Sequence, residues 1–451
     1  MSGAELGGKR VLVVGLGVSG FSAAKALVDL DAKVRVTEAR DGEVVRQRAD
    51  HLKQLGVEVE LGGHDLERLD ADLVVISPGI PPKSAIARAI HDAHLELWSE
   101  VELAYRLADC DFLAITGTNG KTTTTSLLAA ILEAGGVATT AAGNIGFPLI
   151  DAISTVPPGA AIALEVSSFQ LEATHRFRPR VAVLLNVAED HTDWHGSFDA
   201  YRHAKARLIA NQTQTDVFLP NAADRHAMEI ASTAASRVVP FDARSPVQDG
   251  IGVDGRDIVW RGASVMPVDA VPLPGSAGLE DALAAAGAAL EYGVDPSAVA
   301  HAVAAFRPLS HRLEVVGESG GVTYIDDSKA TNPHATLAAL RGMRDVVLIA
   351  GGRSKGIDLG PLAEADSSLI AVIALGEARE ELARIFDGVV PVEVVDSMAD
   401  AVAAAARSSV AGGSVLLSPG CASLDMYDGY AARGDDFARR VADLLRHPRG
   451  E

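Results

Sequence analysis

The sequence is poor in the residues that would cross-link it, bind nucleic acid or anchor it in a membrane. Only two of its 451 residues are cysteines, which is too few for a disulfide framework or a thiolate zinc cluster. Lysine and arginine number 40 against 60 acidic residues, and the net charge of −20 disfavours a general nucleic-acid or anionic-membrane surface, because both require a basic face. No apolar run reaches the roughly 18 residues that span a bilayer.

The beginning of the sequence also lacks the pattern of a secretion signal. It opens with MSGAELGGKR and leads directly into a strand-like run, without an apolar core segment. We therefore expect a soluble, cytoplasmic protein with neither a nucleic-acid nor a membrane partner. In a chain this acidic, an anionic ligand needs a local positive site.

Length and hydrophobic patterning predict three α/β domains. The chain is too long for one ordinary domain, and 48% hydrophobic residues are enough for several cores. Strand-like runs alternate with helical runs, which is typical of parallel sheets with crossover helices. We place a Rossmann-like domain at 1–107, a P-loop ATPase-like domain at 108–307 and a second Rossmann-like domain at 308–451. The third opens with an apparent hairpin, RLEVVGESGGVTYIDDS, and closes with an amphipathic helix from about Tyr427.

The segment AITGTNGKTTTT indicates a phosphate-binding loop. A strand, a glycine-rich turn and Lys121-Thr122 at a helix start place backbone N–H groups, a positive charge and a Mg²⁺-binding hydroxyl around a phosphate. The first glycine of the general Walker pattern would fall at Ile115, so the core of the motif is Gly117 to Thr122. A glycine turn with a surface lysine is the alternative, which the flanking strand and helix disfavour. The segment predicts binding of a nucleoside triphosphate.

A second glycine motif, GLGVSG at 15–20, follows the first strand-like run. It matches the pattern that brings a pyrophosphate-bearing nucleotide to a helix N-terminus, and Glu38 ends the next strand where a ribose-binding acid would lie. The motif does not specify NAD, and a purely structural tight turn remains an alternative. Beside an ATP loop, it suggests that the chain joins ATP to a substrate carried on a nucleotide.

Polar residues end further predicted strands. Glu165 in ALEVSSFQLE and Asp190-His191 in NVAEDH would open onto the crevice beside the phosphate loop, where a carboxylate and an imidazole could bind a second Mg²⁺. Each residue alone is more often a satisfied polar strand end. By its spacing, Lys205 in YRHAKARL is a solvated helix lysine.

Three polar turns follow apolar strands of the third segment. They are IDDSKATNPHA, AGGRSKGID and LLSPGCASLDMYDGY, and their polar residues include Asp327, Ser328, Lys329, Thr331, Lys355, Ser423 and Tyr430. Each could be only a turn, but three in one segment predict a coherent binding edge.

Ten short motifs, in order over the whole chain, resemble those of the Mur ligase family. They are GLGVSG, SPGIP, GTNGKTT, GNIG, LEVSSFQLE, NVAEDH, HRLE, DDSKATNP, GGRSKG and SPGCASLD. Two of them, DDSKATNP and SPGCASLD, are similar to those of the family's D-glutamate-adding branch, and the D-N-P-R signature of its diaminopimelate-adding branch is absent.

This resemblance implies an ATP-dependent acid–amino-acid ligase of cytoplasmic peptidoglycan precursor synthesis. ATP would phosphorylate the alanine carboxylate of UDP-N-acetylmuramoyl-L-alanine, and the amine of D-glutamate would attack the acyl phosphate to give a tetrahedral intermediate that loses phosphate. Because a carboxylate is a poor electrophile, phosphorylation supplies a leaving group, while Mg²⁺ and Lys121 neutralise charge on the transferred phosphoryl group.

The resemblance also implies a role for each matching position. Catalysis would depend on Lys121, Glu165, His191 and Lys205, and two Mg²⁺ ions on Thr122, Glu165, His191 and Lys205, the last as a carbamate. ATP would contact Gly117, Thr118, Asn119, Gly120, Lys121, Thr122, Thr123, Arg312 and Asp327. The UDP substrate would contact Val18, Ser19, Glu38, Ala39, Arg40, Ser77, Gly79, Asn144, Ser167 and Gln170. D-Glutamate would contact Thr331, Lys355, Ser423 and Tyr430.

The chain departs from the family pattern at several positions. Ala277, Gly278 and Asp281 stand where many relatives have His-Asn and a later Asn, which leaves the adenine contacts open. Tyr430 stands at a position expected to be Phe, and Arg353 stands where an acid is common. None of these changes removes a catalytic group.

Other classes of function are less consistent with the motifs. A dehydrogenase with an ATP-regulated domain gives no role to DDSKATNP, and a non-catalytic nucleotide-binding scaffold would tolerate loss of Lys121 or Glu165, which are present. A sister ligase for another amino acid, or a folylpolyglutamate-type synthase, is the closest alternative. We expect a monomer in which the third domain closes on the second before chemistry.

Overall fold

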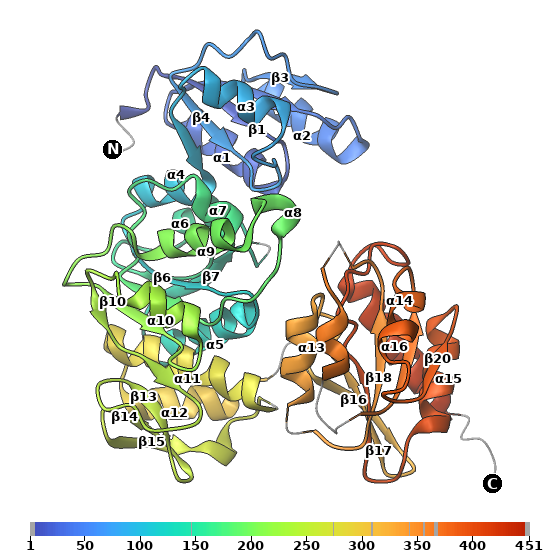
Figure 1. The fold of residues 1–451 in the computed structure, drawn as a ribbon. Helices are drawn as coiled ribbons and strands as arrows, with labels where there is room; N and C mark the ends of the chain where they lie inside the picture. The colour runs from blue at the N-terminus through green and yellow to red at the C-terminus, as the bar shows by residue number, and fades with distance from the viewer. Residues whose placement is uncertain are drawn as a thin grey trace. The chain divides into compact units, whose positions relative to one another are not determined.

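The structure is a computed structural model that describes residues 5–145, 147–273, 275–307, 310–341, 343–354, 357–364 and 369–446. The chain forms two compact units (Figure 1). The first comprises Met1–Val187, Trp194–Ala270 and Glu280–Ala305, and the second comprises Ala188–Asp193, Val271–Leu279 and Phe306–Glu451. Within the described ranges, no helix combines the length and the apolar character needed to cross a bilayer.

The first sheet of the first unit is parallel, with the strand order β3-β2-β1-β4-β5. Its central strand β1 is buried in all but its first residue, as expected of a parallel strand covered on both faces. The order reverses between β1 and β4, so the turn after β1 lies at a switch point, where such sheets bind ligands. The elements are β1 (Arg10–Val14), α1 (Val18–Asp29), β2 (Lys33–Glu38), α2 (Glu43–Gln54), β3 (Glu58–Leu61), β4 (Leu73–Ile76), α3 (Ala85–Asp92) and β5 (Leu97–Ser99).

The second sheet of the first unit has the order β11-β10-β9-β6-β8-β7, and all of its neighbouring strands are parallel. Strand β6 lies between β8 and β9, which brings the segments after these three strands to one edge. The elements are α4 (Glu100–Leu107), β6 (Asp111–Thr116), α5 (Lys121–Ala134), β7 (Thr139–Gly143), α6 (Leu149–Thr155), β8 (Ala161–Glu165), α7 (Ser168–Glu172), β9 (Val181–Leu184), α8 (Thr192–His195), α9 (Phe198–Ala206), η2 (Arg207–Ile209), β10 (Val217–Pro220), α10 (Arg225–Ala231) and β11 (Arg237–Val238).

A small four-stranded sheet, β12-β13-β14-β15, follows and packs with α11 and α12. A Cβ at Gly287 of α11 would lie 2.8 Å from side-chain atoms of both Ile251 and Leu219, so glycine lets this helix approach both sheets closely. The elements are β12 (Phe241–Asp242), β13 (Ile251–Asp254), β14 (Asp257–Trp260), β15 (Ala263–Pro267), η3 (Val268–Ala270), α11 (Gly275–Tyr292) and α12 (Pro296–Ala305).

The two parallel sheets of the first unit share one continuous hydrophobic core, which runs through Trp98 and Leu103 to Phe112 and Phe177. Polar contacts reinforce the junction. The buried carboxylate of Glu100 accepts the backbone N–H of Leu149 at 2.8 Å, at the start of α6. This continuity explains why both sheets belong to one compact unit.

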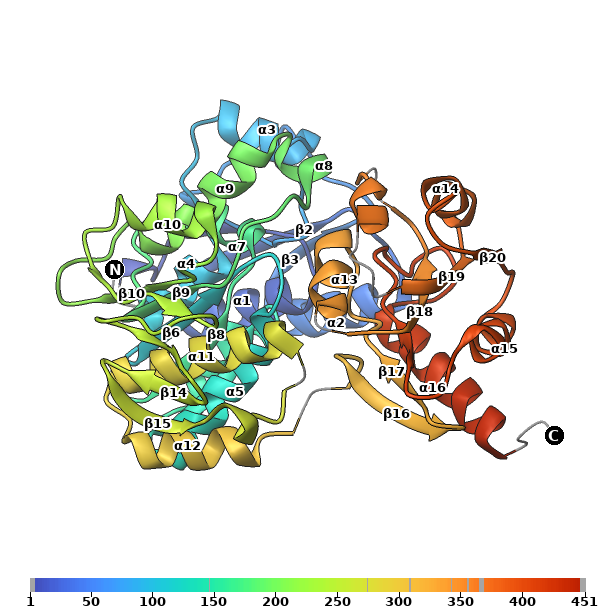
Figure 2. The ribbon, with the colours of Figure 1, turned by 60° about the horizontal axis from the view of Figure 1, so that its bottom comes forward.

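The second unit contains a sheet of order β16-β17-β21-β18-β19-β20. Strands β16 and β17 are antiparallel, which confirms the predicted hairpin. One core lies under α15 and α16, which contact each other (Figure 2), and a separate core lies under α13 and α14. The elements are β16 (Glu314–Ser319), β17 (Val322–Asp326), α13 (Pro333–Leu340), β18 (Val346–Gly351), η4 (Gly360–Glu364), β19 (Leu369–Leu375), α14 (Arg379–Ile385), β20 (Val392–Val394), α15 (Met398–Ser408), β21 (Ser414–Leu417) and α16 (Tyr430–Arg446).

Candidate active site

The predicted phosphate loop joins β6 to α5. Gly120, the N-cap of α5, has a φ of +85°, and a Cβ there would lie 2.2 Å from Asp281 Oδ1, so no other residue fits without a shift. The loop is held by Asn186, which follows the neighbouring strand β9: the Thr118 N–H donates to Asn186 O at 3.0 Å, and the Asn119 N–H donates to Asn186 Oδ1 at 2.8 Å. These bonds fix the loop in the shape from which its N–H groups and the helix N-terminus can bind phosphate.

Two lysine amines meet at one carbonyl of this loop. Lys121 Nζ donates to Gly117 O at 2.8 Å and to Thr118 O at 2.9 Å. Lys205 Nζ donates to the same Gly117 O at 2.7 Å and lies 4.5 Å from the centre of the Tyr201 ring. Because like charges repel strongly in buried surroundings, this arrangement favours an anion beside the loop.

The prediction from spacing that Lys205 is a solvated helix lysine is wrong. Lys205 is only 2% exposed, because the face of α9 that carries it is turned toward the phosphate loop. Helical periodicity places Lys205 on the same face as Tyr201, one turn earlier, and Tyr201 is buried too.

Glu165 ends β8 beside the loop and is 2% exposed. Its Oε1 accepts a hydrogen bond from Asn144 Nδ2 at 2.8 Å. Its Oε2 is buried and has no hydrogen-bond partner among the described residues. A buried carboxylate oxygen without a partner is rare in folded proteins and suits a cation ligand.

His191 follows β9 with a φ of +53°, in the left-handed region that few non-glycine residues adopt. Its Nε2 lies 3.5 Å from Asp190 Oδ2, and the same carboxylate oxygen accepts a hydrogen bond from Asn332 Nδ2 at 3.2 Å. The segment Ala188–Asp193 thus belongs to the second unit, whereas Thr122, Glu165 and Lys205 belong to the first.

The glycine turn after β1 uses its three glycines differently. A Cβ at Gly15 would lie 2.8 Å from Ser77 Cβ, and a Cβ at Gly20 would lie 2.0 Å from the Gly15 carbonyl oxygen. A Cβ at Gly17 would meet no atom within 4 Å. The first and third glycines are therefore needed by the fold, and the middle one leaves open space at the N-terminus of α1.

Glu38 braces this turn from the end of β2. Its carboxylate accepts the backbone N–H of Leu16 at 2.7 Å and the guanidinium of Arg40 at 3.0 Å. Burial alone would raise the pKa of Glu38, but the hydrogen bonds from Arg40 and Leu16 outweigh it and lower that pKa to about 2. Five other residues predicted for the UDP substrate lie at the same sheet edge, after β1, β2 and β4, and are Val18, Ser19, Ala39, Ser77 and Gly79. The remaining three, Asn144, Ser167 and Gln170, follow β7 and β8 of the second sheet.

In the second unit, Asp327 follows β17 and is almost fully buried. Burial raises its pKa to about 7, although Ser418 Oγ donates to its Oδ2 at 2.9 Å and the charge of Arg312 acts in the opposite direction. The predicted nucleotide residues Arg312 and Asp327 thus flank the β16–β17 hairpin at its base.

A hydrogen-bonded cluster shapes this hairpin. His311 Nδ1 lies 2.7 Å from Asp326 Oδ2, and the His311 N–H donates to Glu314 Oε2 at 2.9 Å. A Cβ at Gly434 would lie 2.2 Å from His311 Nδ1, so glycine on α16 makes room for the imidazole. These three side chains are close enough to bind a metal, but their mutual contacts already give each a partner. We therefore read the cluster as a brace next to Arg312.

Arg433 joins the three polar turns of the second unit, and it is not among the residues predicted from the sequence. It is 2% exposed and donates to Ser328 Oγ at 2.9 Å, to Ser328 O at 2.8 Å, to Cys421 O at 3.1 Å and to Gly351 O at 3.4 Å. Burial lowers its pKa to about 10. The sequence does hold a signal: Arg433 lies one helical turn before the buried Phe437 on the apolar face of α16.

The residues predicted for D-glutamate follow strands of this sheet. Thr331 lies before α13, Ser423 follows β21 and is buried, and Tyr430 begins α16. Lys329, which the sequence places in the first polar turn without assigning it a ligand, has its Nζ 3.8 Å from the centre of the Tyr430 ring. Lys355 lies outside the described residues.

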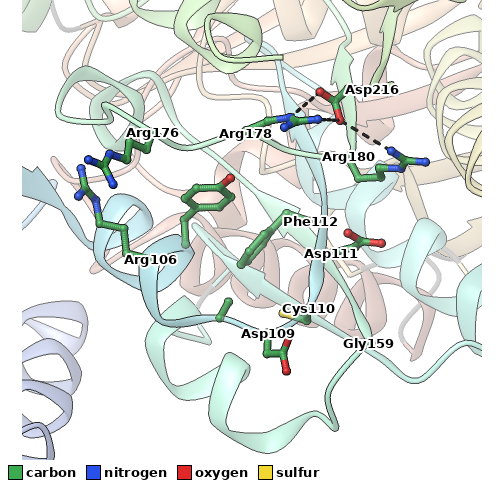
Figure 3. Close-up of a pocket in the computed structure, with 12 residues that line it drawn as sticks. Arg106, Asp109, Cys110, Asp111, Phe112, Gly159, Arg176, Arg178, Arg180 and Asp216 are labelled. Carbon is green, nitrogen blue, oxygen red and sulfur yellow. Dashed lines mark hydrogen bonds and ion pairs between the residues drawn. The ribbon is translucent and has the colours of Figure 1, made fainter. Parts of the chain in front are cut away.

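A pocket of about 630 Å³ lies at the opposite, amino-terminal edge of the central sheet (Figure 3). Arg178, Arg180 and Asp216 line it, just before β9 and β10. Its charges are largely matched: Arg178 Nε lies 2.7 Å from Asp216 Oδ2, and Arg106 Nε lies 2.6 Å from Glu102 Oε1. We place the chemistry at the carboxyl edge, because the glycine turns and the unpartnered carboxylate oxygen lie there.

Three family descriptions match successive parts of the chain. "Mur ligase MurD-like, N-terminal domain" matches residues 9–99, "Mur ligase middle domain" matches residues 115–289, and "Mur ligase, glutamate ligase domain" matches residues 311–421.

Several full-length relatives carry the name UDP-N-acetylmuramoylalanine--D-glutamate ligase. The protein of Frankia casuarinae is 44% identical over 444 residues, which cover 96% of this chain and 94% of that one. The protein of Thermobifida fusca is 42% identical over 465 residues, which cover 98% and 99%.

Solved structures share the fold at low sequence identity. MurF from Acinetobacter baumannii has a TM-score of 0.61 at 18% identity and covers 92% of this chain and 90% of its own. MurC from Thermotoga maritima has a TM-score of 0.59 at 18% identity and covers 97% and 99%. The three-domain α/β architecture predicted from the sequence is therefore confirmed.

Proposed function

The chain belongs to the Mur ligase family, and we propose that it is the member that joins D-glutamate to UDP-N-acetylmuramoyl-L-alanine with hydrolysis of ATP to ADP and phosphate. Identity to D-glutamate-adding relatives along nearly the whole chain supports the substrates. The observation in the structure that carries the reaction is the phosphate loop, with two lysine amines on Gly117 O beside a buried carboxylate.

The chemistry follows from these groups. The loop N–H groups and Lys121 would hold the triphosphate and stabilise charge on the transferred phosphoryl group as the alanine carboxylate attacks it. The amine of D-glutamate then displaces phosphate from the acyl phosphate, so that one amide bond forms and one carboxyl–phosphate bond breaks. Closure of the site must exclude water, because an acyl phosphate hydrolyses readily.

We propose that Thr122 and Glu165 of the first unit, with His191 and a carbamylated Lys205, hold Mg²⁺. The unpartnered Glu165 Oε2 supports this, because a divalent cation would satisfy a buried oxygen that the described chain leaves unbonded. When bound, Mg²⁺ neutralises the phosphate oxygens and so lowers the barrier to phosphoryl transfer.

Carbamylation of Lys205 has its own electrostatic support. As an ammonium, Lys205 shares Gly117 O with Lys121, and two cations then repel each other near the loop. As a carbamate, it becomes an anion that attracts both Lys121 and a metal. After addition of ¹³C-bicarbonate, a carbamate carbon signal is expected in the wild type and not in Lys205→Arg; an equal signal in both would refute the assignment.

We also propose that the turns after β1, β2 and β4 hold the uridine diphosphate. Both oxygens of Glu38 are engaged by Leu16 and Arg40, which leaves the exposed guanidinium of Arg40 rather than a carboxylate at the rim. A cationic rim suits a diphosphate, and the Glu38 carboxylate that would bind the ribose hydroxyls of NAD is already engaged on both oxygens, which argues against the dehydrogenase alternative.

In the second unit, we assign Arg312 and Asp327 to ATP and assign Thr331, Lys355, Ser423 and Tyr430 to D-glutamate. These assignments are supported by the guanidinium of Arg433, which donates hydrogen bonds to all three turns and so holds them together. We further propose that the protein acts as a monomer in the cytoplasm, and sedimentation velocity would test the first of these.

The test of the function is ADP release from Mg-ATP and UDP-N-acetylmuramoyl-L-alanine with D-glutamate, L-glutamate, L-lysine or meso-diaminopimelate added in turn. We expect release that depends on D-glutamate and a product heavier by one glutamyl residue. Preference for another amino acid would leave the ligase chemistry in place and overturn the D-glutamate site. If none of the four amino acids supports ADP release, the proposed nucleotide substrate is wrong.

A further inference from the structure

A Ser-His-Glu cluster with a buried serine and histidine and a half-buried glutamate lies beside the phosphate loop in the first unit. Ser168 and Glu172 are the first and last residues of α7, and His195 is the last residue of α8. Ser168 Oγ lies 3.0 Å from His195 Nε2, and His195 Nδ1 lies 2.9 Å from Glu172 Oε1. The His195 side chain is 0% exposed.

The order of these groups is that of a hydrolase triad, but their setting differs. Ser168 is buried at the first position of a helix, so a substrate carbonyl could not reach its Oγ. The contact of Nδ1 with Glu172 is an ion-pair contact without good hydrogen-bond geometry. The bond between Ser168 and Nε2 is therefore the stronger directional link, and the cluster serves to fix side chains in place.

On one side, the cluster fixes α7, which carries two residues assigned to the UDP substrate. Ser167 and Gln170 form a capping box: the Gln170 N–H donates to Ser167 Oγ at 3.2 Å, and the Ser167 N–H donates to Gln170 Oε1 at 3.0 Å. Because Ser168 and Glu172 are the first and last residues of α7, the imidazole of His195 contacts both ends of the short helix that carries this box.

On the other side, the cluster leads to the phosphate loop. The imidazole centre of His195 lies 5.3 Å from the centre of the Tyr201 ring. The Tyr201 hydroxyl lies 3.1 Å from Thr118 Oγ1 of the loop, and Lys205 Nζ lies over the same ring. One imidazole thus contacts both the helix of the UDP-substrate residues and the aromatic ring that supports the loop.

We infer that His195 is a positioning residue that couples α7 to the phosphate loop, so that the alanine carboxylate and the triphosphate are aligned with each other. This rests on the proposed function, because it presumes that the two ligands meet there. The flat ring is required: it bonds Ser168, faces Glu172 and stacks on Phe169 with an interplanar angle of 19°. Misplacement of reacting groups by about 1 Å can cost about 100-fold in rate.

The test compares His195→Ala, His195→Gln and His195→Asn with His203→Ala, an exposed histidine on α9. Gln can keep a contact with Ser168, and Asn can keep one with Glu172. For each variant, kcat and the three substrate KM values are measured well below its Tm, and Mg-ATP binding is measured by calorimetry.

For His195→Ala we expect kcat/KM for ATP and for the UDP substrate to fall about tenfold or more, with the KM for D-glutamate unchanged. His195→Gln should recover part of the loss, and His203→Ala should match the wild type. A lower Tm with unchanged kinetic constants would mean a purely structural role and overturn the inference. So would an equal rise in all three KM values.

Calorimetry separates this inference from the proposed function. Weaker Mg-ATP binding by His195→Ala supports the link to the loop, whichever amino acid the enzyme adds. If His195→Ala does not fold, Ser168→Ala and Glu172→Gln replace it, and unchanged ATP and UDP-substrate constants in both would overturn the inference.

Discussion

Lys121 carries the charge that the phosphate loop offers to a triphosphate, and its amine now lies on two loop carbonyls. We expect Lys121→Ala to abolish phosphoryl transfer, with ADP release reduced about 1000-fold or more. Binding of the UDP substrate should largely remain, because the turns assigned to its uridine diphosphate follow β1, β2 and β4 of the first sheet, whereas Lys121 follows β6 of the second. Calorimetric titration with that substrate checks the second part, and equal loss of both would mean that the sites are assigned wrongly.

Asp327 makes stability depend on pH. Its folded-state pKa is about 7 because of burial, against about 3.9 in the unfolded chain, so the folded state binds more protons between these values. Stability should therefore fall as pH rises from about 4 to 7 and stay lower above 7. Asp327→Asn should raise the Tm at pH 8 and change it little at pH 4, by differential scanning calorimetry. A larger gain at pH 4 would contradict this assignment of the charge.

At the scale of elements, the turn after β1 separates glycines needed for folding from one available for a ligand. Gly20→Ala should destabilise the protein by several kcal/mol, because its Cβ would lie 2.0 Å from a backbone oxygen. Gly17→Ala should leave the Tm unchanged and weaken binding of the UDP substrate, because a diphosphate would approach through the open space at the start of α1. Thermal melts and substrate titrations of both variants test this. Unchanged affinity of Gly17→Ala for the UDP substrate would show that the diphosphate does not bind at this turn.

Helix α16 holds together, through Arg433, the turns that we assign to D-glutamate. Arg433→Leu leaves Ser328 O, Gly351 O and Cys421 O without this donor, which should cost about 2–4 kcal/mol of unfolding free energy. Arg433→Lys should also lower the free energy of unfolding, because one ammonium group cannot reproduce the hydrogen bonds of the planar guanidinium.

Urea unfolding and the KM for D-glutamate measure the effect of Arg433. Arg439→Leu is the matched control, since that arginine lies on the exposed face of the same helix. An equal effect of both substitutions would show that α16 is sensitive to any substitution, and that the hydrogen bonds of Arg433 make no particular contribution to stability.

At the scale of the whole molecule, the residues assigned to the UDP substrate and the phosphate loop lie in the first unit, whereas Arg312 and Asp327, assigned to ATP, and the residues assigned to D-glutamate lie in the second. We therefore expect the two units to close on each other before amide formation. Small-angle scattering should change when an ATP analogue and the UDP substrate are added together. Identical profiles with and without both ligands would count against domain closure.

The sequence by itself determined the local parts of this protein. Alternating strand and helix patterns, the glycine turns after β1 and β6, and the hairpin of β16 and β17 could all be predicted, because each depends on a few neighbouring residues. The resemblance of ten motifs likewise identified the family, since such motifs are contiguous in the chain.

Only the tertiary structure decided what buried polar side chains do. From the sequence, Lys205 is an ordinary helix lysine and Arg433 is one of several arginines. In the structure, Lys205 donates to Gly117 O, and Arg433 contacts turns that are distant in the sequence. The pKa of Asp327 and the role of His195 are equally non-local. The physical reason is that burial, and the partner that satisfies a buried charge, depend on segments far apart in sequence.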